Sequence, residues 1–358
     1  MIKINGFASG EIWPDDNGTH VNAHGGGILV HEGVFYWFGE HKIEGDAGNQ
    51  AHVGVHVYAS TDLSHWKDAG IALPVSKDPE SDITSGCVLE RPKVIFNQKT
   101  RKFVMWFHLE LKGQGYNAAR VGVAVSDRVT GPYTFIRSFR PNAGFWPINV
   151  TEVQKAAIHN PALMTEMKAL GFYGGPNPVT PTLPILARDF ATGQMSRDMT
   201  LFVDDDGKAY HICASEDNST LHISQLNDDY LDSTGKYVRV FEHRWHEAPA
   251  ICKYRGKYWL LTSGCTGWAP NAARSAVADS IWGPWTELGN PAEGINPQNG
   301  LGPELTFGAQ STFILPIPGK KDTFIALFDL WRPENAIDGR YAWLPICFKE
   351  DRFTISWA

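Results

Sequence analysis

Basic residues are outnumbered by acidic ones in this chain. The 358-residue sequence has 32 Lys and Arg against 39 Asp and Glu, which gives a formal net charge of −7. Binding to nucleic acid relies on clustered cations that release counter-ions, so this balance argues against a nucleic-acid partner. The sequence also lacks any run of about 18 apolar residues, and it therefore predicts no membrane-spanning segment and no membrane partner.

Cysteines and targeting signals are sparse as well. The five cysteines are scattered without a C-x-x-C pair, which argues against a zinc site or a disulfide framework and favours small core residues for most of them. The N-terminus, residues 1–6, shows no signal peptide. The compartment stays open: cytoplasmic for the chain as it stands, periplasmic or secreted if a leader has been removed.

A pattern of short β-type runs recurs five times along the chain. Each copy has an apolar run, a polar turn, a second run rich in aromatic residues, and a third run. The first runs are centred near positions 28, 94, 201, 251 and 314. Repeats of about 50 residues with about four strands are typical of propeller blades. The sequence therefore predicts an all-β fold, a five-bladed β-propeller that forms a single catalytic domain over residues 1–358.

One interval between copies is much longer than the others. Positions 94 and 201 are 201 − 94 = 107 residues apart, which indicates an insertion at about 149–192 between blades two and three. Residues 162–171 have helical apolar spacing and end in a glycine, so we expect this insertion to be partly helical. It can form a rim wall beside a cleft or a cap that faces solvent, and the sequence favours neither.

Polar residues occupy the same position in all five copies. Four residues before the numbered positions stand His24, Glu90, Arg197, Glu247 and Gln310, and Asp198 is one residue further on. The innermost strands of a propeller converge on its axis, so we expect these side chains to surround one mouth. A single polar residue at a strand start is ordinarily solvated, but five equivalent ones favour a site. Carboxyl groups that share a pocket shift each other's pKa, as general acid–base cleavage of a sugar acetal requires.

A family resemblance appears in the segments around these positions. The matching segments are residues 23–29, 35–40, 90–97, 196–199, 215–218, 247–249, 264–271 and 309–311. At these residues the chain resembles the five-bladed propellers of glycoside hydrolase family 43, and more narrowly the exo-β-1,3-galactanase-like subfamily. The resemblance covers nearly the whole chain apart from the insertion.

The resemblance implies roles for individual residues. Glu247 would be the general acid, Asp198 would orient it, and Gln310 would position the attacking water, in its imidic tautomer. The family's usual blade-one aspartate is missing, because that position reads Ala23-His24-Gly25. Glu90 would line the same subsite and is the chemical alternative as base. Further substrate-binding residues are expected at Glu40, Tyr116, Asn218, Thr266, Trp268, His24, Arg197 and Trp331.

The resemblance also implies a function. We expect an inverting exo-acting hydrolase that releases galactose from β-1,3-galactan, the arabinogalactan backbone, and that works as a monomer on an oligo- or polysaccharide. No cofactor is expected, except a structural calcium ion on the propeller axis as a further option. Two alternatives stay open: an α-L-arabinofuranosidase or β-xylosidase of the same fold, and a propeller that binds carbohydrate without cleaving it.

Overall fold

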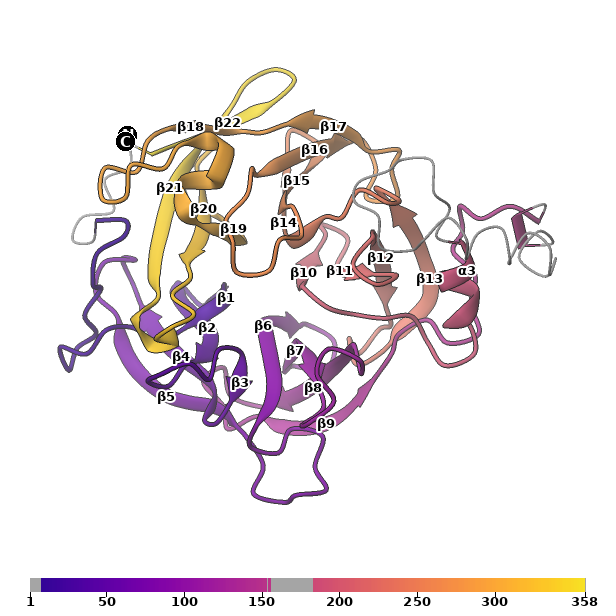
Figure 1. Ribbon diagram of the computed structural model, residues 1–358, viewed down its shortest axis with the longest axis horizontal. Coiled ribbons are helices and arrows are strands. Elements are labelled where there is room, and N and C mark those ends of the chain that lie inside the picture. Colours follow the sequence, from indigo (N-terminus) through magenta and orange to yellow (C-terminus); the bar gives the residue numbers. More distant parts are fainter. Residues whose placement is uncertain (1–7, 153, 156–182, 358) are drawn as a thin grey trace.

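Five β-sheets surround a common axis in the part of the chain that is described. The computed structural model describes residues 8–152, 154–155 and 183–357. Viewed down the axis, the sheets follow one another around the ring in chain order (Figure 1). The predicted all-β, five-bladed β-propeller is confirmed. The described helices include none with the length and apolar character that a membrane crossing needs.

The main four strands of each blade are antiparallel, and the innermost of the four comes first in the chain; in blade 5 a further short strand, β18, joins β22 in parallel. Blade 1 consists of β1 (His24–His31), β2 (Val34–His41), β4 (Gly54–Ser60) and β5 (Lys67–Pro74). Blade 2 consists of β3 (Gln50–Ala51), β6 (Cys87–Asn97), β7 (Lys102–Glu110), β8 (Arg120–Ser126) and β9 (Thr134–Phe139). Blade 3 consists of β10 (Met199–Val203), β11 (Ala209–Ser215), β12 (Thr220–Leu226) and β13 (Ser233–Val240).

The last two blades complete the ring. Blade 4 consists of β14 (Glu247–Tyr254), β15 (Lys257–Ser263), β16 (Arg274–Ala278) and β17 (Thr286–Gly289). Blade 5 consists of β18 (Ala292–Gly294), β19 (Gln310–Pro316), β20 (Phe324–Leu330), β21 (Arg340–Phe348) and β22 (Phe353–Trp357). The described helices include α3 (Leu183–Arg188) and the short 3-10 turns η1 (Pro303–Gly308) and η2 (Ala336–Asp338).

In blades 1 and 4 a tight turn with left-handed residues joins the first strand of the blade to the second. Glu32 and Gly33, between β1 and β2, have φ of 49° and 79°, and Arg255 and Gly256, between β14 and β15, have φ of 50° and 75°. Two successive left-handed residues define the type I′ turn, whose twist matches that of the flanking strands. In these two blades the turn fixes the register between the first and second strands.

The blades are held together by apolar clusters at their interfaces. Five clusters of buried side chains lie between neighbouring sheets, and each innermost strand contacts the next one around the ring, including β1 with β19. The segment before β1 covers the joint between blades 5 and 1. Its Trp13 is 1% exposed and packs edge-on against Trp343 of β21 with ring centroids 5.0 Å apart. The ring therefore holds the five inner strands in fixed positions.

The predicted insertion is described only in part. Within 149–192, helix α3 packs on blade 3, because the fully buried Leu186 contacts Val150 and Tyr237 of β13. The helix predicted over 162–171 lies outside the described residues. Arg188 at the end of α3 contacts the turn between β11 and β12 through Asp217, at 3.1 Å.

Candidate active site

A β-bulge follows the predicted polar position in four of the five innermost strands, just after residues 24, 90, 247 and 310. The pairing register shifts between His24 and Gly27, between Glu90 and Lys93, between Glu247 and Ala250, and between Ser311 and Phe313. In three of these strands the residue after this position is left-handed: Gly25, Arg91 and Ala248 have φ of 60°, 56° and 49°. A bulge changes the direction of a side chain from the one that strict alternation would give. The repeat thus controls where the polar side chains point.

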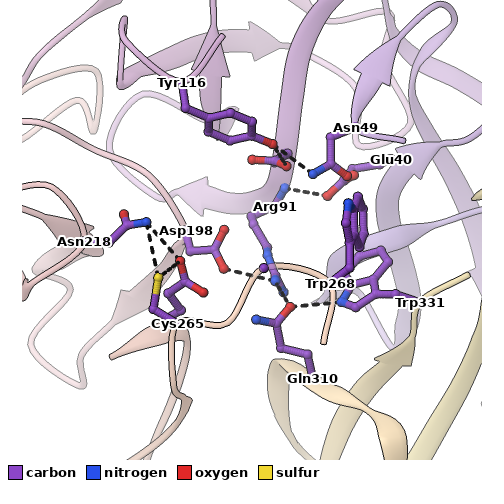
Figure 2. Close-up of a pocket in the computed structure, with 13 residues that line it drawn as sticks. Glu40, Asn49, Arg91, Tyr116, Asp198, Asn218, Cys265, Trp268, Gln310 and Trp331 are labelled. Atoms are coloured by element: carbon purple, nitrogen blue, oxygen red, sulfur yellow. Dashed lines mark hydrogen bonds and ion pairs between the residues drawn. The ribbon is translucent and has the colours of Figure 1, made fainter. Parts of the chain in front are cut away.

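One pocket of about 290 Å³ brings together most of the predicted site residues. Its lining contains the four predicted catalytic residues and five of the predicted substrate-binding residues: Glu90, Asp198, Glu247, Gln310, Glu40, Tyr116, Asn218, Trp268 and Trp331. All five blades contribute to it (Figure 2). Four more residues complete the lining: Asn49, Arg91, Cys265 and Gly267.

Glu247, the first residue of β14, has the properties of a proton donor. Its Oε1 accepts hydrogen bonds from Nδ2 of Asn218 at 3.0 Å and from the thiol of Cys265 at 3.1 Å. Burial raises the pKa of Glu247, and the negative charge of Asp198 raises it further, to about 7, although the Cys265 hydrogen bond opposes this. A carboxyl group with this pKa keeps its proton near neutral pH and can still release it.

Arg91 connects two of the predicted catalytic residues. Its Nη2 donates to Oε1 of Gln310 at 2.6 Å and lies 3.0 Å from Oδ2 of Asp198. The same Asp198 oxygen accepts the backbone N–H of Ala248 at 3.2 Å. The Arg91 side chain is buried, so this ion pair is poorly screened by solvent. The guanidinium therefore holds Asp198 against the backbone that carries Glu247.

The Gln310 amide has a defined orientation. Its Oε1 accepts hydrogen bonds from Arg91 and from Nε1 of Trp331 at 2.9 Å, and its Nε2 donates to Oγ of Ser263 at 3.0 Å. Arg and Trp side chains can only donate, so the amide oxygen must face them. The amide nitrogen carries a second N–H besides the one that Ser263 accepts. Figure 2 shows Gln310 with Arg91 and Trp331 on one side of the pocket.

Glu90 is held as a carboxylate. Its Oε1 accepts the Tyr116 hydroxyl at 2.8 Å, and its Oε2 lies 2.6 Å from Nδ1 of His108, whose Nε2 is 3.0 Å from Glu110. Burial disfavours the charged form of both partners, but their mutual attraction prevails. It lowers the pKa of Glu90 to about 2 and raises that of His108 to about 9. Glu90 therefore has no proton to donate at neutral pH.

In blade 1, Glu40 reaches the pocket and His24 does not. Oε1 of Glu40 accepts the backbone N–H of Arg91 at 2.9 Å. A Cβ atom at Gly25 would lie 2.1 Å from that oxygen, so only glycine fits beside it. His24 is fully buried, with its Nδ1 3.3 Å from Asp329 of β20, which also accepts the N–H of Gly25 at 2.6 Å. The carboxylate of Asp329 thus keeps the His24 ring outside the pocket lining.

Arg197 and Thr266 also lie outside the pocket lining, each because of a local partner. Nη2 of Arg197 donates to the backbone carbonyl of Tyr116 at 2.7 Å, which fastens the loop that carries Tyr116. The hydroxyl of Thr266 donates to the carbonyl of Ala269 at 2.6 Å and so closes the turn that presents Trp268. Both side chains act here on the position of a pocket residue.

Two tryptophans form an aromatic wall of the pocket. Trp268 is 40% exposed and meets Trp331 edge-on, with ring centroids 5.7 Å apart. The Arg91 guanidinium lies 5.5 Å from the Trp331 ring centroid. Exposed aromatic faces of this kind can stack on the apolar face of a sugar ring.

The described axial residues do not fit a calcium ion. Calcium prefers six to eight oxygen ligands. Near the axis, however, the side chains of Lys93 and Arg91 already bind the oxygens that could act as ligands. Nζ of Lys93 donates to the carbonyls of Gly25 at 2.9 Å and Arg91 at 3.3 Å. The cluster of Glu90, His108 and Asp198 has ligand atoms within 4.8 Å of one another, but its carboxylates already pair with the raised-pKa His108 and with Arg91.

Sequence reasoning missed Asn49, Arg91 and Cys265. Arg91 lies in a matching segment directly after Glu90. A positive charge next to that predicted site residue is the signal that could have indicated it. Cys265 lies in a matching segment, but the sequence favours a core position for most of the cysteines and singles out none for the site; Cys87, Cys213 and Cys252 are indeed buried, whereas Cys265 is only partly buried. Asn49 lies outside the repeated runs and the matching segments, so the sequence carried no signal for it. It reaches the pocket from the loop before β3 and donates to the Tyr116 hydroxyl at 2.9 Å.

Comparison with known proteins places this chain in a family. A sequence model described as glycosyl hydrolases family 43 matches residues 178–302. A solved family 43 β-1,3-galactosidase with galactodeoxynojirimycin is 51% identical, with a TM-score of 0.90 over 98% of this chain and 99% of that one. The exo-β-1,3-galactanase of Clostridium thermocellum is 32% identical, with a TM-score of 0.76 over 98% of this chain and 64% of that one.

A third structure agrees with these two. The exo-β-1,3-galactanase of Phanerochaete chrysosporium, solved with galactose, is 32% identical, with a TM-score of 0.75 over 98% of this chain and 66% of that one. A search of curated proteins gives no significant match. The fold and these similarities are those of a glycoside hydrolase. The chain belongs to glycoside hydrolase family 43.

Proposed function

We propose that this enzyme is an inverting, exo-acting β-1,3-galactosidase that releases galactose from β-1,3-galactan, the backbone of arabinogalactan. The observation that carries the proposal is the common pocket of Glu247, Asp198 and Gln310, where the raised pKa of Glu247 suits a general acid. The β-1,3-galactosidase and exo-β-1,3-galactanases among the similar structures support the choice of sugar and linkage.

Glu247 supplies the proton for the leaving group. Its proton passes to the glycosidic oxygen while the bond from that oxygen to the anomeric carbon breaks. Asp198 keeps the pKa of Glu247 high by its charge, and Arg91 keeps Asp198 in place. After the step Glu247 is an anion, which Asn218 and Cys265 stabilise by donating to Oε1.

The attacking water needs a partner on the other side of the sugar. Inverting enzymes leave room for a water between two groups about 6.5–9.5 Å apart. We assign the water to Gln310, whose side-chain nitrogen in the imidic form can take the proton that the water loses. That form places a hydrogen on Oε1, so Arg91 and Trp331 cannot then both keep the hydrogen bonds that they donate to this oxygen. Glu90 is the weaker candidate, because Tyr116 and His108 occupy its two oxygens and its pKa of about 2 makes it a poor base.

The choice of sugar is tested with a substrate panel. The enzyme is incubated with β-1,3-galactobiose, an aryl α-L-arabinofuranoside and an aryl β-D-xyloside under the same conditions. We expect kcat/KM on galactobiose to exceed that on either aryl glycoside by at least about 100-fold, because a pocket built to hydrogen-bond particular hydroxyls rejects analogues that lack them. Faster cleavage of the arabinofuranoside or the xyloside would replace the galactosidase assignment.

The pH dependence follows from the raised pKa of Glu247. Catalysis requires the protonated form, so kcat should fall about tenfold per pH unit above a pKa near 7. Glu90 must be ionised, and its lowered pKa keeps it ionised down to about pH 2, so it should add no acidic limb between pH 4 and 6. A kcat profile on galactobiose checks this. Full activity maintained at pH 9 would contradict the assignment of Glu247.

Chelation tests whether the propeller axis holds a calcium ion. Because Lys93 and Arg91 occupy the axial oxygens, we expect EDTA to change neither kcat nor the melting temperature of the enzyme. Calcium should restore nothing after dialysis. A fall in melting temperature with EDTA that calcium reverses would establish the metal site that these residues do not fit.

A further inference from the structure

The Cys265 thiol and the Asn218 side-chain amide both donate a hydrogen bond to the same carboxylate oxygen of Glu247. Sγ of Cys265 lies 3.1 Å from Oε1, and Nδ2 of Asn218 lies 3.0 Å from the same atom, while the two donors are 3.7 Å from each other. Figure 2 shows Cys265 and Asn218 together on one side of the pocket. An oxygen that accepts two hydrogen bonds is a poor place for a proton, because its lone pairs are used. The proton of the neutral acid is therefore favoured on Oε2.

Both donors are held by rigid loops. Asn218 ends a run of three left-handed residues, with Glu216, Asp217 and Asn218 at φ of 50°, 57° and 70°. The fully buried Glu216 anchors this turn through two hydrogen bonds with Arg239 at 2.6 and 2.7 Å. Strained backbone of this kind persists only where the surroundings determine it.

The loop that carries Cys265 is fastened next to the cysteine. The N–H of Gly264 donates to Oδ1 of Asn271 at 2.6 Å, and Nδ2 of Asn271 donates back to the Gly264 carbonyl at 3.1 Å. Burial and the nearby Glu247 raise the pKa of the Cys265 thiol to about 12. The sulfur therefore keeps its hydrogen and remains a donor throughout the pH range in which Glu247 titrates.

We propose that Cys265 is a positioning residue for the general acid: with Asn218 it fixes Oε1 of Glu247, so that the transferable proton sits on Oε2 and faces the leaving group. The inference rests on the proposed role of Glu247. The thiol touches the acid and stabilises the anion that forms when the proton leaves. Loss of the thiol should therefore slow the acid-dependent step and raise the pKa of Glu247.

Three single variants test the proposal: Cys265→Ala, which removes the donor, Cys265→Ser, which keeps one, and Cys347→Ala as a matched control at an exposed cysteine. On β-1,3-galactobiose we expect Cys265→Ala to lower kcat about fivefold with little change in KM, as the loss of one hydrogen bond implies. Cys265→Ser should stay within about twofold of the wild type, and Cys347→Ala should equal it. An aryl β-galactoside with a good leaving group should be almost insensitive to all three.

A titration that needs no substrate separates this inference from the proposed function. The pKa of Glu247 is measured by difference infrared spectroscopy, with the carboxyl band identified by its absence in Glu247→Gln. We expect the midpoint in Cys265→Ala to lie about half a pH unit above that of the wild type. If the wild type released no galactose from galactobiose, the proposed function would fail and the titration would still decide on Cys265.

Two results would overturn the proposal. One is a Cys265→Ala variant whose kcat and Glu247 titration both match the wild type. The other is a Cys265→Ser variant as impaired as Cys265→Ala, because then the size or packing of the side chain would matter instead of its hydrogen. A purely structural role would lower the melting temperature and slow both substrates to the same extent.

Discussion

Replacing Glu247 by glutamine is expected to lower kcat on β-1,3-galactobiose by about 10³–10⁴-fold, the upper range for loss of a general acid. Glutamine has nearly the same shape, and its amide oxygen can still accept the hydrogen bonds from Asn218 and Cys265, so the pocket should stay intact. Only the transferable proton is lost. Steady-state kinetics with purified variants measure the effect.

The leaving group provides an internal control for this variant. In a dinitrophenyl β-galactoside the dinitrophenolate group leaves without being protonated. Glu247→Gln should therefore lose at least about tenfold less activity on this substrate than on galactobiose. Glu32→Gln, at an exposed glutamate in the β1–β2 turn, should behave as the wild type on both substrates. An equal loss on the two substrates, or a Glu247→Gln variant with near-normal turnover of galactobiose, would remove Glu247 from the role of acid.

The second large effect is expected at Gln310. Its change to alanine removes the proposed partner of the attacking water and also removes the oxygen to which Arg91 and Trp331 donate. We expect kcat on galactobiose to fall about 10²–10³-fold, with a smaller change in KM. Azide, which needs no deprotonation, should restore part of the turnover and give a galactosyl azide of inverted configuration.

Glu90→Gln is the matched variant for Gln310→Ala. It keeps the shape of the side chain but breaks the pair with His108, and we expect it to raise KM more than it lowers kcat, because Glu90 lines the pocket as a fixed anion. Azide should not rescue it. A Gln310→Ala variant with near-full turnover, together with an azide-rescued Glu90→Gln, would transfer the handling of the water to Glu90.

The fold could be predicted from the sequence because each blade repeats local signals. Glycines in tight turns, such as Gly33 and Gly256, and aromatic-rich second strands are set by residues a few positions apart. The same spacing located the inner strands and hence Glu90, Asp198, Glu247 and Gln310 at one pocket. The helix predicted over 162–171 stays a prediction, since it lies outside the described residues.

The remainder of the site depends on contacts between distant parts of the chain. His24 is held away from the pocket lining by Asp329, which is 305 residues later, and no local pattern records that contact. Arg91 reaches Gln310 and Asp198 because a bulge gives it a left-handed backbone. Cys265 is only partly buried and faces Glu247, a contact between two positions 18 residues apart that the spacing of motifs does not show. Such pairings are set by blade packing, which the spacing of motifs does not contain.

The stereochemistry of the first product tests the central claim most directly. Hydrolysis of β-1,3-galactobiose by the wild-type enzyme is followed by time-resolved ¹H NMR before the released galactose mutarotates. We expect the galactose from the non-reducing end to appear first as the α-anomer, because in the proposed mechanism a water attacks opposite the oxygen that Glu247 protonates. Initial release of β-galactose, or no release of galactose at all, would contradict it.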